Sequence, residues 1–171
     1  KDAVEGLKAE AIVVDNGSSP ENKEETERMI GALSDEKIRV AYLYQPMEFN
    51  FSQMCNMGAE AAEGRFLLFL NDDVELAVRG CVERMAALAA RPYTGAVGMK
   101  LYYPESKRIQ HAGITNLPMG PVHKRQFLED GAACEYTYRG NVNYLAVTAA
   151  CLMTECEKFW EVGGFAEELQ V

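Results

Sequence analysis

The stretch Phe66-Leu67-Leu68-Phe69-Leu70-Asn71-Asp72-Asp73 decides the fold. Its run of large apolar residues, entered through Gly64, predicts a strand that is buried on both faces. The strand ends at two adjacent carboxylates, and open parallel sheets bind ligands outside the carboxyl ends of their strands. Adjacent residues in an extended loop point in different directions, so one carboxylate can hold a hydroxyl of a ligand while the other holds a hard cation. A solvated acidic turn is the alternative interpretation.

A second strand of the same kind is predicted at Ala11-Ile12-Val13-Val14. It stops at Asp15 and a dense cluster of turn residues, after which the acidic stretch from Glu21 to Glu27 opens a helical pattern. Asp15 alone is typical of a turn or a helix cap. Paired with the triplet Asn71-Asp72-Asp73, it becomes a candidate for hydrogen bonding a base or a ribose.

Strand and helix patterns alternate through the first hundred residues, which indicates a parallel sheet with crossover helices. Further elements of this part are expected as strands over 38–44 and 95–100, a helix capped by Ser52 and a helix over 79–90. The stretch 101–138 has Gly, Pro and aromatic residues without helical periodicity, which predicts loops and short antiparallel strands. The last expected elements are a strand over 142–154 and a short helix over 155–162, ended by Gly163 and Gly164.

The composition is that of one globular domain, with 171 residues, 48% hydrophobic and 25% charged. The net charge of −9 disfavours a nucleic-acid or anionic-membrane surface and suits a site that recruits a divalent cation before a diphosphate. No apolar run approaches a membrane span of roughly 18 residues. The five cysteines are odd in number and show no C-x-x-C spacing, which indicates reduced thiols in a cytoplasmic protein and no zinc site.

Several short motifs occur in a recognisable order. They are Val13-Val14-Asp15-Asn16-Gly17-Ser18-Ser19, the block from Phe51 to Glu75 with Asn56, Gly58, Ala62, Gly64 and Asn71-Asp72-Asp73 in place, then Val97-Gly98, Lys100-Leu101, Ile109-Gln110-His111-Ala112-Gly113, Ala149-Ala150-Cys151-Leu152 and Gly163-Gly164-Phe165. From about Ala11 to Leu169 this order and spacing resemble family-two inverting glycosyltransferases of the rhamnosyltransferase-like kind.

The resemblance implies a GT-A fold, a three-layer α/β/α architecture whose sheet is mostly parallel with a small antiparallel part. It implies transfer of a sugar from a nucleoside diphosphate sugar to a glycan or lipid-linked acceptor with inversion, assisted by Mn²⁺ or Mg²⁺. Asp73 is then the metal ligand, Asp72 binds the ribose or the sugar, and Asp15 with Asn16 binds the base and its ribose. A cytoplasmic location, peripheral at the inner membrane face, is expected.

The chain departs from the family pattern at both ends. Ala166 stands at a usually acidic position, and the later acidic motif that supplies the general base is absent, which leaves Glu167 and Glu168 as weak candidates. The family's opening strand and its base-binding turn are also absent from Lys1 to Glu10. We therefore expect residues 1–171 to be a single catalytic domain without the first strand and the acceptor region, a fragment whose sheet is rearranged or completed by another copy in a homo-oligomer.

The remaining candidates are weaker. For His111 and His123, candidates for phosphate or acceptor binding, a structural or surface role is favoured. For Lys124, Arg125 and Arg139, candidates for diphosphate binding, a solvated role has equal weight. Core packing is favoured over stacking on an acceptor sugar for the aromatic residues Tyr102, Tyr103, Tyr136, Tyr138 and Trp160. Two other classes of protein compete with the transferase. One is a module that binds a nucleotide sugar without turnover. The other is a receiver-like signalling domain, whose acid pair follows the first strand; here the pair follows the third visible strand, which argues against it.

Overall fold

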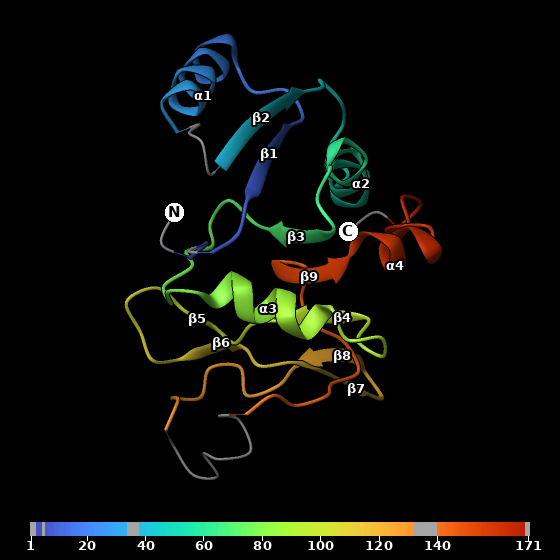
Figure 1. The fold of residues 1–171 in the computed structure, drawn as a ribbon. Helices are drawn as coiled ribbons and strands as arrows, with labels where there is room; N and C mark the ends of the chain where they lie inside the picture. Colours follow the sequence, from blue (N-terminus) through green and yellow to red (C-terminus); the bar gives the residue numbers. More distant parts are fainter. Residues whose placement is uncertain (1–2, 5, 34–37, 132–139, 170–171) are drawn as a thin grey trace.

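The computed structural model describes residues 3–4, 6–33, 38–131 and 140–169. In chain order its elements are β1 (Ala9–Asp15), α1 (Pro20–Leu33), β2 (Ile38–Tyr44), α2 (Phe51–Ala61), β3 (Phe66–Leu70), α3 (Cys81–Ala89), β4 (Ala96–Gly98), β5 (Leu101–Tyr102), β6 (Ile109–His111), β7 (Ile114–Leu117), β8 (Gly120–His123), β9 (Cys151–Glu155) and α4 (Cys156–Glu161). Figure 1 shows β1 and β2 with their helices at the top, β3, β9 and α3 in the middle, and β5 to β8 below. Within the described ranges, no helix is both long enough and apolar enough to span a bilayer.

The β1–β2 pair forms as the alternating pattern predicts. The two strands are parallel, with Ala9 opposite Ile38 and Asp15 opposite Tyr44, and α1 is the crossover between them. Helix α2 packs closely on this pair, because a Cβ atom added at Gly58 would lie only 3.3 Å from Cγ2 of Val14. The small residue in the middle of α2 therefore permits the close packing of helix and strand.

Strand β3 is covered on both faces, as its continuous apolar run predicts. Phe66 and Leu68 pack against the buried face of α3, whereas Leu67 and Phe69 pack with residues of α2 and α4. The alternation of side chains along a strand sends these two pairs to opposite faces. Leu70, the last residue, is 41% exposed where the strand runs out toward the acidic loop.

The chain is α/β, but the expectation of a mostly parallel sheet is wrong. Strand β9 lies between β3 and β4 and pairs antiparallel with both, and β1–β2 form a sheet of their own. Between β1 and β3 a side chain takes the place of a backbone ladder: Oε1 of Glu10 accepts hydrogen bonds from the backbone N–H groups of Glu63 (2.6 Å) and Gly64 (3.0 Å). These donors precede β3, so a carboxylate joins the two strands at their starts.

The lower level consists of two short antiparallel pairs, β5–β6 and β7–β8. This agrees with the loops and short antiparallel strands predicted from residue 101 onward, while residues 132–139 lie outside the described part. Because β4 runs antiparallel to β9, it leaves the sheet at the same end as β3. The chain therefore enters the lower level on the side where β3 ends in Asn71.

Two further expectations need correction. The strand expected over 142–154 comprises only Cys151–Glu155. The segment before it packs its side chains against two glycines instead of pairing its backbone: an added Cβ atom would lie 2.6 Å from Val147 at Gly98 and 2.3 Å from Tyr144 at Gly113. The cap of α2 is Asn50 and not Ser52, since Asn50 Oδ1 accepts the Gln53 N–H at 3.0 Å. A side chain one residue before the helix reaches that orphan N–H, as an N-cap does.

Candidate functional site

The loop after β3 carries two carboxylates that the rest of the described chain leaves free. Asn71 anchors the loop, because its N–H donates to the Ala150 carbonyl (3.0 Å) and its own carbonyl accepts the Val74 N–H (3.2 Å). Asp72 and Asp73 lie at the tip of this turn, are exposed, and form no hydrogen bond or ion pair with any described residue. Asn71 is therefore the turn residue, as expected, and both acids are available to a ligand.

The Asp15 carboxylate, in contrast, is already occupied by its own loop. Its Oδ1 accepts the N–H groups of Gly17 (2.9 Å) and Ser18 (2.8 Å), and its Oδ2 accepts the hydroxyl of Tyr42 on β2. Burial raises the pKa of this carboxyl, but the hydrogen bond from Tyr42 and those from the two amides outweigh it and lower the pKa to about 2. Asp15 is therefore ionised at neutral pH and shapes the turn that leads into α1.

Asn16 continues the same loop. Its Nδ2 donates to the Met47 carbonyl (3.3 Å), and its carbonyl accepts the Met47 N–H (2.9 Å). The Asp15 loop is thus tied to the segment after β2, so that both loops at the carboxyl ends of this parallel pair form one unit. Binding of a base or ribose by Asp15 and Asn16 stays a prediction.

The two acidic loops belong to different sheets. In Figure 1, β1 and β2 end at the top of the view, whereas the chain after β3 leaves toward the side where α3 begins. Within the described residues no hydrogen bond or ion pair joins the Asp15 loop to the loop of Asp72 and Asp73. No backbone ladder pairs β1 with β3 in the described residues, where the Glu10 side chain makes the contact instead, so the two loops do not share one sheet edge.

The free carboxylates fit a hard divalent cation better than any other group of the described chain. Mg²⁺ and Mn²⁺ prefer oxygen ligands, and Mg²⁺ commonly takes one or two carboxylates while phosphates and water complete its shell. Asp72 and Asp73 offer such oxygens. No cluster of three or more His, Cys, Asp or Glu side chains that would hold a metal unaided occurs in the described ranges. The arrangement therefore suits a cation that arrives together with a phosphorylated ligand.

The Gly163-Gly164-Phe165 segment is held by a residue to which the sequence assigned no role. Asn56, buried on α2, donates through Nδ2 to the Phe165 carbonyl (2.9 Å) and accepts the Phe165 N–H through Oδ1 (2.9 Å). The same Nδ2 lies 2.8 Å from Oε1 of Glu167. One buried amide thus fixes both the turn after α4 and one of the two weak base candidates, while Glu168 is exposed with no partner among the described residues.

His111 and His123 form a pair inside the lower level. His111 is 0% exposed, and its Nε2 accepts the N–H groups of Gly113 (3.2 Å) and Thr148 (3.3 Å). Its ring proton is therefore on Nδ1, which lies 3.1 Å from Nδ1 of His123. Burial, and secondly the charge of His123, lower the pKa of His111 to about 4. His111 is a structural, neutral histidine and cannot reach a phosphate.

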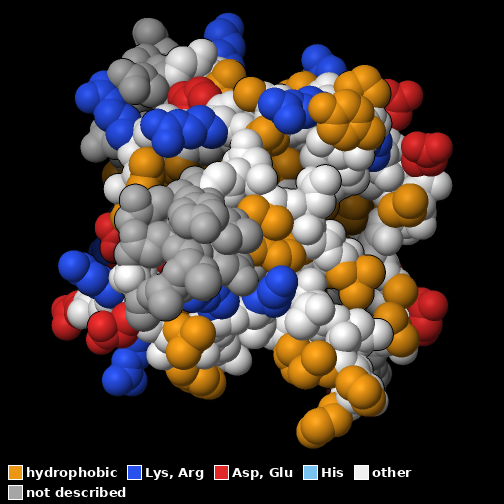
Figure 2. All heavy atoms as spheres, turned by 90° about the horizontal axis from the view of Figure 1, so that it is seen from below, with side chains coloured by type: hydrophobic (Ala, Val, Ile, Leu, Met, Phe, Trp, Pro, Cys, Tyr) orange, Lys and Arg blue, Asp and Glu red, His pale blue; other side chains and the backbone are white. Residues whose placement is uncertain are grey.

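The remaining candidates divide between packing and surface roles. Lys124 lies over the Tyr144 ring, with Nζ 5.0 Å from its centroid, and Trp160 packs edge-on against Phe159. The Tyr102 hydroxyl donates to Asp130. Arg139, Tyr136, Tyr138 and Cys134 lie outside the described residues. Figure 2, which views the molecule from below, shows hydrophobic side chains at the surface with Lys and Arg side chains among them; the exposed ones of the lower level include Tyr102, Leu117, Met119, Phe127 and Leu128.

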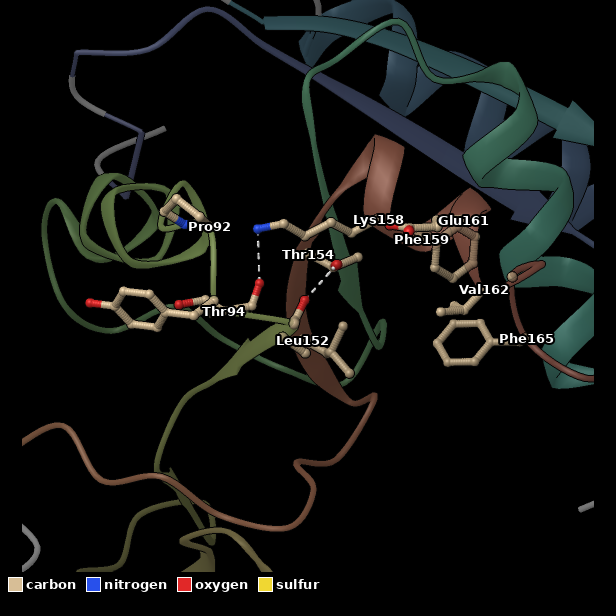
Figure 3. Close-up of a pocket in the computed structure, with 13 residues that line it drawn as sticks. Pro92, Thr94, Leu152, Thr154, Lys158, Phe159, Glu161, Val162 and Phe165 are labelled. Carbon is tan, nitrogen blue, oxygen red and sulfur yellow. Dashed lines mark hydrogen bonds between the residues drawn. The ribbon is translucent and has the colours of Figure 1, made fainter.

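A hollow of about 540 Å³ lies beside α4 and β9, and neither Asp72 nor Asp73 is among the residues that line it (Figure 3). Its lining includes Thr154 and Leu152 of β9, which pair with Leu67 and Phe69 of β3. Two of its polar side chains are already used: Lys158 Nζ donates to the carbonyls of Arg91 (2.9 Å) and Thr94 (2.9 Å), and Thr154 Oγ1 donates to the Gly95 carbonyl (2.8 Å). These bonds fasten α4 and β9 to the turn after α3, so this hollow has a structural explanation.

The fold and the free acids define an α/β protein that is suited to bind a phosphorylated ligand at the end of a buried strand. A model of glycosyl transferase family 2 matches residues 2–143, so the chain belongs to that family. The match includes both acidic loops. The resemblance seen in the motifs is thereby confirmed.

Two relatives show where such a sequence occurs. The uncharacterized protein y4gI of Sinorhizobium fredii is 39% identical over 160 residues, which cover 92% of this chain and 17% of that protein. The O-antigen biosynthesis protein RfbC of Myxococcus xanthus is 33% identical over 174 residues, which cover 95% of this chain and 12% of that protein. The chain thus spans less than a fifth of the length of either relative. No solved structure matches it significantly.

Proposed function

We propose that this chain is the donor-binding part of an inverting glycosyltransferase that acts in polysaccharide biosynthesis. The observation that carries the proposal is the pair of exposed carboxylates of Asp72 and Asp73, which have no partner in the described part of the chain, at the end of a buried strand in a chain of this family. A nucleoside diphosphate sugar needs both a cation for its diphosphate and a group that accepts hydrogen bonds from its hydroxyls, and two adjacent carboxylates can meet both needs. Residues 1–171 act as one domain in this proposal.

The residues have separate roles in the proposed site. Asp73 holds Mn²⁺ or Mg²⁺, which supplies positive charge for the leaving diphosphate. Asp72 accepts hydrogen bonds from the ribose or the sugar hydroxyls. Asp15, fixed as an anion by Tyr42 and two backbone amides, and Asn16 present the loop that receives the base. A carboxylate accepts several hydrogen bonds, so the bonds already made at Asp15 leave capacity for a ligand.

Inversion needs a base on the face opposite the leaving group. Glu167 is the better of the two candidates within this chain, since Asn56 orients one of its carboxylate oxygens. A module that binds the nucleotide sugar without turnover is the second candidate function, favoured by the exposure of Glu167 and by the alanine at position 166. The acceptor in this proposal is a glycan or a lipid-linked saccharide, met at the cytoplasmic face of the inner membrane; the O-antigen biosynthesis protein among the relatives supports a role in polysaccharide biosynthesis.

Calorimetric titration of the chain with UDP and with dTDP, each with and without Mn²⁺, tests the proposal. Asp73→Asn keeps the shape of the side chain but removes its charge. It should abolish the Mn²⁺ dependence and weaken nucleotide binding about tenfold or more. Glu75→Gln is the matched control, because Glu75 is an exposed acid of the same loop; it should bind as the unaltered chain does. Unchanged Mn²⁺-dependent affinity in Asp73→Asn would refute the metal role.

A further inference from the structure

A shallow cavity of about 370 Å³ lies between two loops of the lower level and is lined by Tyr103, Ser106, Arg108 and Phe127. Its volume falls in the range of roughly 300–1,000 Å³ that is usual for small-molecule sites. The rings of Tyr103 and Phe127 stack with an interplanar angle of 5° and centroids 5.6 Å apart. Phe127 is nevertheless 63% exposed, so this aromatic pair presents an open face to solvent.

Backbone strain is concentrated in the same two loops. Among the described residues, the non-glycine residues with positive φ are Glu105 (52°), Arg125 (58°) and Phe127 (69°). Each such conformation costs on the order of 1–3 kcal/mol and persists only where the surroundings enforce it, most often at functional sites. Hydrogen bonds between the Phe127 N–H and the Ile109 carbonyl (2.9 Å) and between the Ile109 N–H and the Leu128 carbonyl (2.9 Å) enforce it here. The result is a large apolar ring held outward at a cost to the fold.

The polar groups around the rings are donors, and they are available. The Arg108 guanidinium forms no ion pair or hydrogen bond with any residue of the described ranges. Gln126 Nε2 donates to the Tyr103 hydroxyl (3.2 Å), which leaves that hydroxyl proton free to be donated onward. An aromatic face flanked by a guanidinium and hydroxyl groups fits a ring that is apolar on one face and carries hydroxyl oxygens around its edge.

The position of this cavity relates it to the free carboxylates. Strand β4 leaves the sheet at the end where Leu70 of β3 pairs with Cys151, and the chain continues directly through β5 into the loop of Tyr103. In Figure 1 the loop after β3 and the turn between β5 and β6 emerge on the same side of the molecule. A ligand in the cavity therefore lies at the end of the sheet that carries Asp72 and Asp73.

We propose that Tyr103, Phe127 and Arg108 form a binding platform for a pyranose unit of the acceptor saccharide, with the sugar stacked on the exposed ring of Phe127 and its hydroxyls bonded to Arg108. The identification of the saccharide as acceptor rests on the proposed transferase function; its binding does not.

The test uses the whole chain and the methyl glycosides of glucose, galactose, mannose and rhamnose as probes, with saturation-transfer NMR and the ring signals of Phe127 as readouts. Phe127→Gly removes the ring and also the strain, because glycine adopts positive φ without steric cost. It should keep or raise the melting temperature while weakening saccharide binding about tenfold or more. Glu105→Gly is the matched control: it relieves strain in the same loops without touching the platform, and binding should stay unchanged.

Binding of UDP with Mn²⁺, measured on the same variants, separates this inference from the proposed function. Phe127→Gly should leave nucleotide affinity unchanged, and Asp73→Asn should leave saccharide binding unchanged. No binding of any glycoside to the unaltered chain, or equal binding by Phe127→Gly, overturns the platform and leaves the donor site standing. A change in the chemical shifts of the Phe127 ring on adding UDP, with no change on adding any glycoside, also overturns the platform and assigns the rings to the base.

Discussion

Acidification should destabilise this protein through one buried side chain, His111. Its pKa is lowered to about 4 from the usual 6.5, mainly by burial and then by the charge of His123. In the unfolded chain the imidazole takes up a proton near pH 6.5, whereas in the folded chain it stays neutral until about pH 4. The unfolded state therefore binds more protons between these values, and the free energy of unfolding falls as the pH falls through this window.

The size of the effect follows from the two pKa values. Each pH unit in the window costs about 1.4 kcal/mol for one proton, so lowering the pH from about 7 to about 5 should remove about 2 kcal/mol. The carboxyl groups with lowered pKa values, Glu10, Asp15, Glu21, Asp130 and Glu155, have ordinary pKa values of 4.5 or 3.8 and contribute mainly at lower pH. The interval above pH 5 therefore reports His111 with little interference.

Urea unfolding followed by circular dichroism at several pH values in this interval measures the loss, and proton NMR of the imidazole ring measures the pKa directly. His111→Gln should be less stable at neutral pH, and its stability should change little over the same interval. His123→Gln should raise the pKa of His111 but keep it below 6.5, because burial is the larger cause. A His111 pKa near 6.5, or the same pH dependence in His111→Gln, would refute the reasoning.

Two other substitutions test the packing around the candidate site. Asn56→Ala removes a buried amide that makes hydrogen bonds at 2.8–2.9 Å. Urea unfolding should show that it lowers the free energy of unfolding by about 2–4 kcal/mol. A loss below about 1 kcal/mol would show that the turn after α4 is held by other contacts. Gly113→Ala should lower the free energy of unfolding by at least about 2 kcal/mol, because residue 113 has a φ of 95° and the added Cβ atom would lie 2.3 Å from the Tyr144 ring. Gly95→Ala is the control: its added Cβ atom meets no atom within 4 Å, so thermal melts of both variants should show it to be nearly neutral.

Local features of the fold could be predicted from the sequence because their signals are local. The run Phe66–Leu70 forms a strand with both faces covered, since five adjacent large apolar side chains must be buried on either side of the backbone. The turn residues after Val14 end β1 at Asp15, and Asn71 makes a turn where the polar triplet begins. Those signals also place both acids of the β3 loop at a strand end.

The partners of the strands could not be predicted, because several apolar strands of similar pattern could pair with β3 and the pattern does not say which one does. Strand β3 pairs with β9, which is distant in the sequence: Cys151, the partner of Leu70, lies 81 positions after it. The pairing of β9 makes this sheet antiparallel, and β1–β2 form a separate sheet. The two acidic loops consequently lie on separate sheets, although each was recognisable by itself.

By itself, the sequence determined the family, the strand that carries Asp72 and Asp73, and the turn chemistry of the Asp15 loop, since periodicity, capping and motif order are properties of neighbouring residues. Tertiary structure alone decided which carboxylates stay free. Asp15 meets Tyr42 only because β1 and β2 pair in register, and Phe127 meets Tyr103 only because two distant loops are hydrogen bonded together. Contacts of this kind depend on long-range pairing, whose free energy is shared among many residues and cannot be read from any single segment of the sequence.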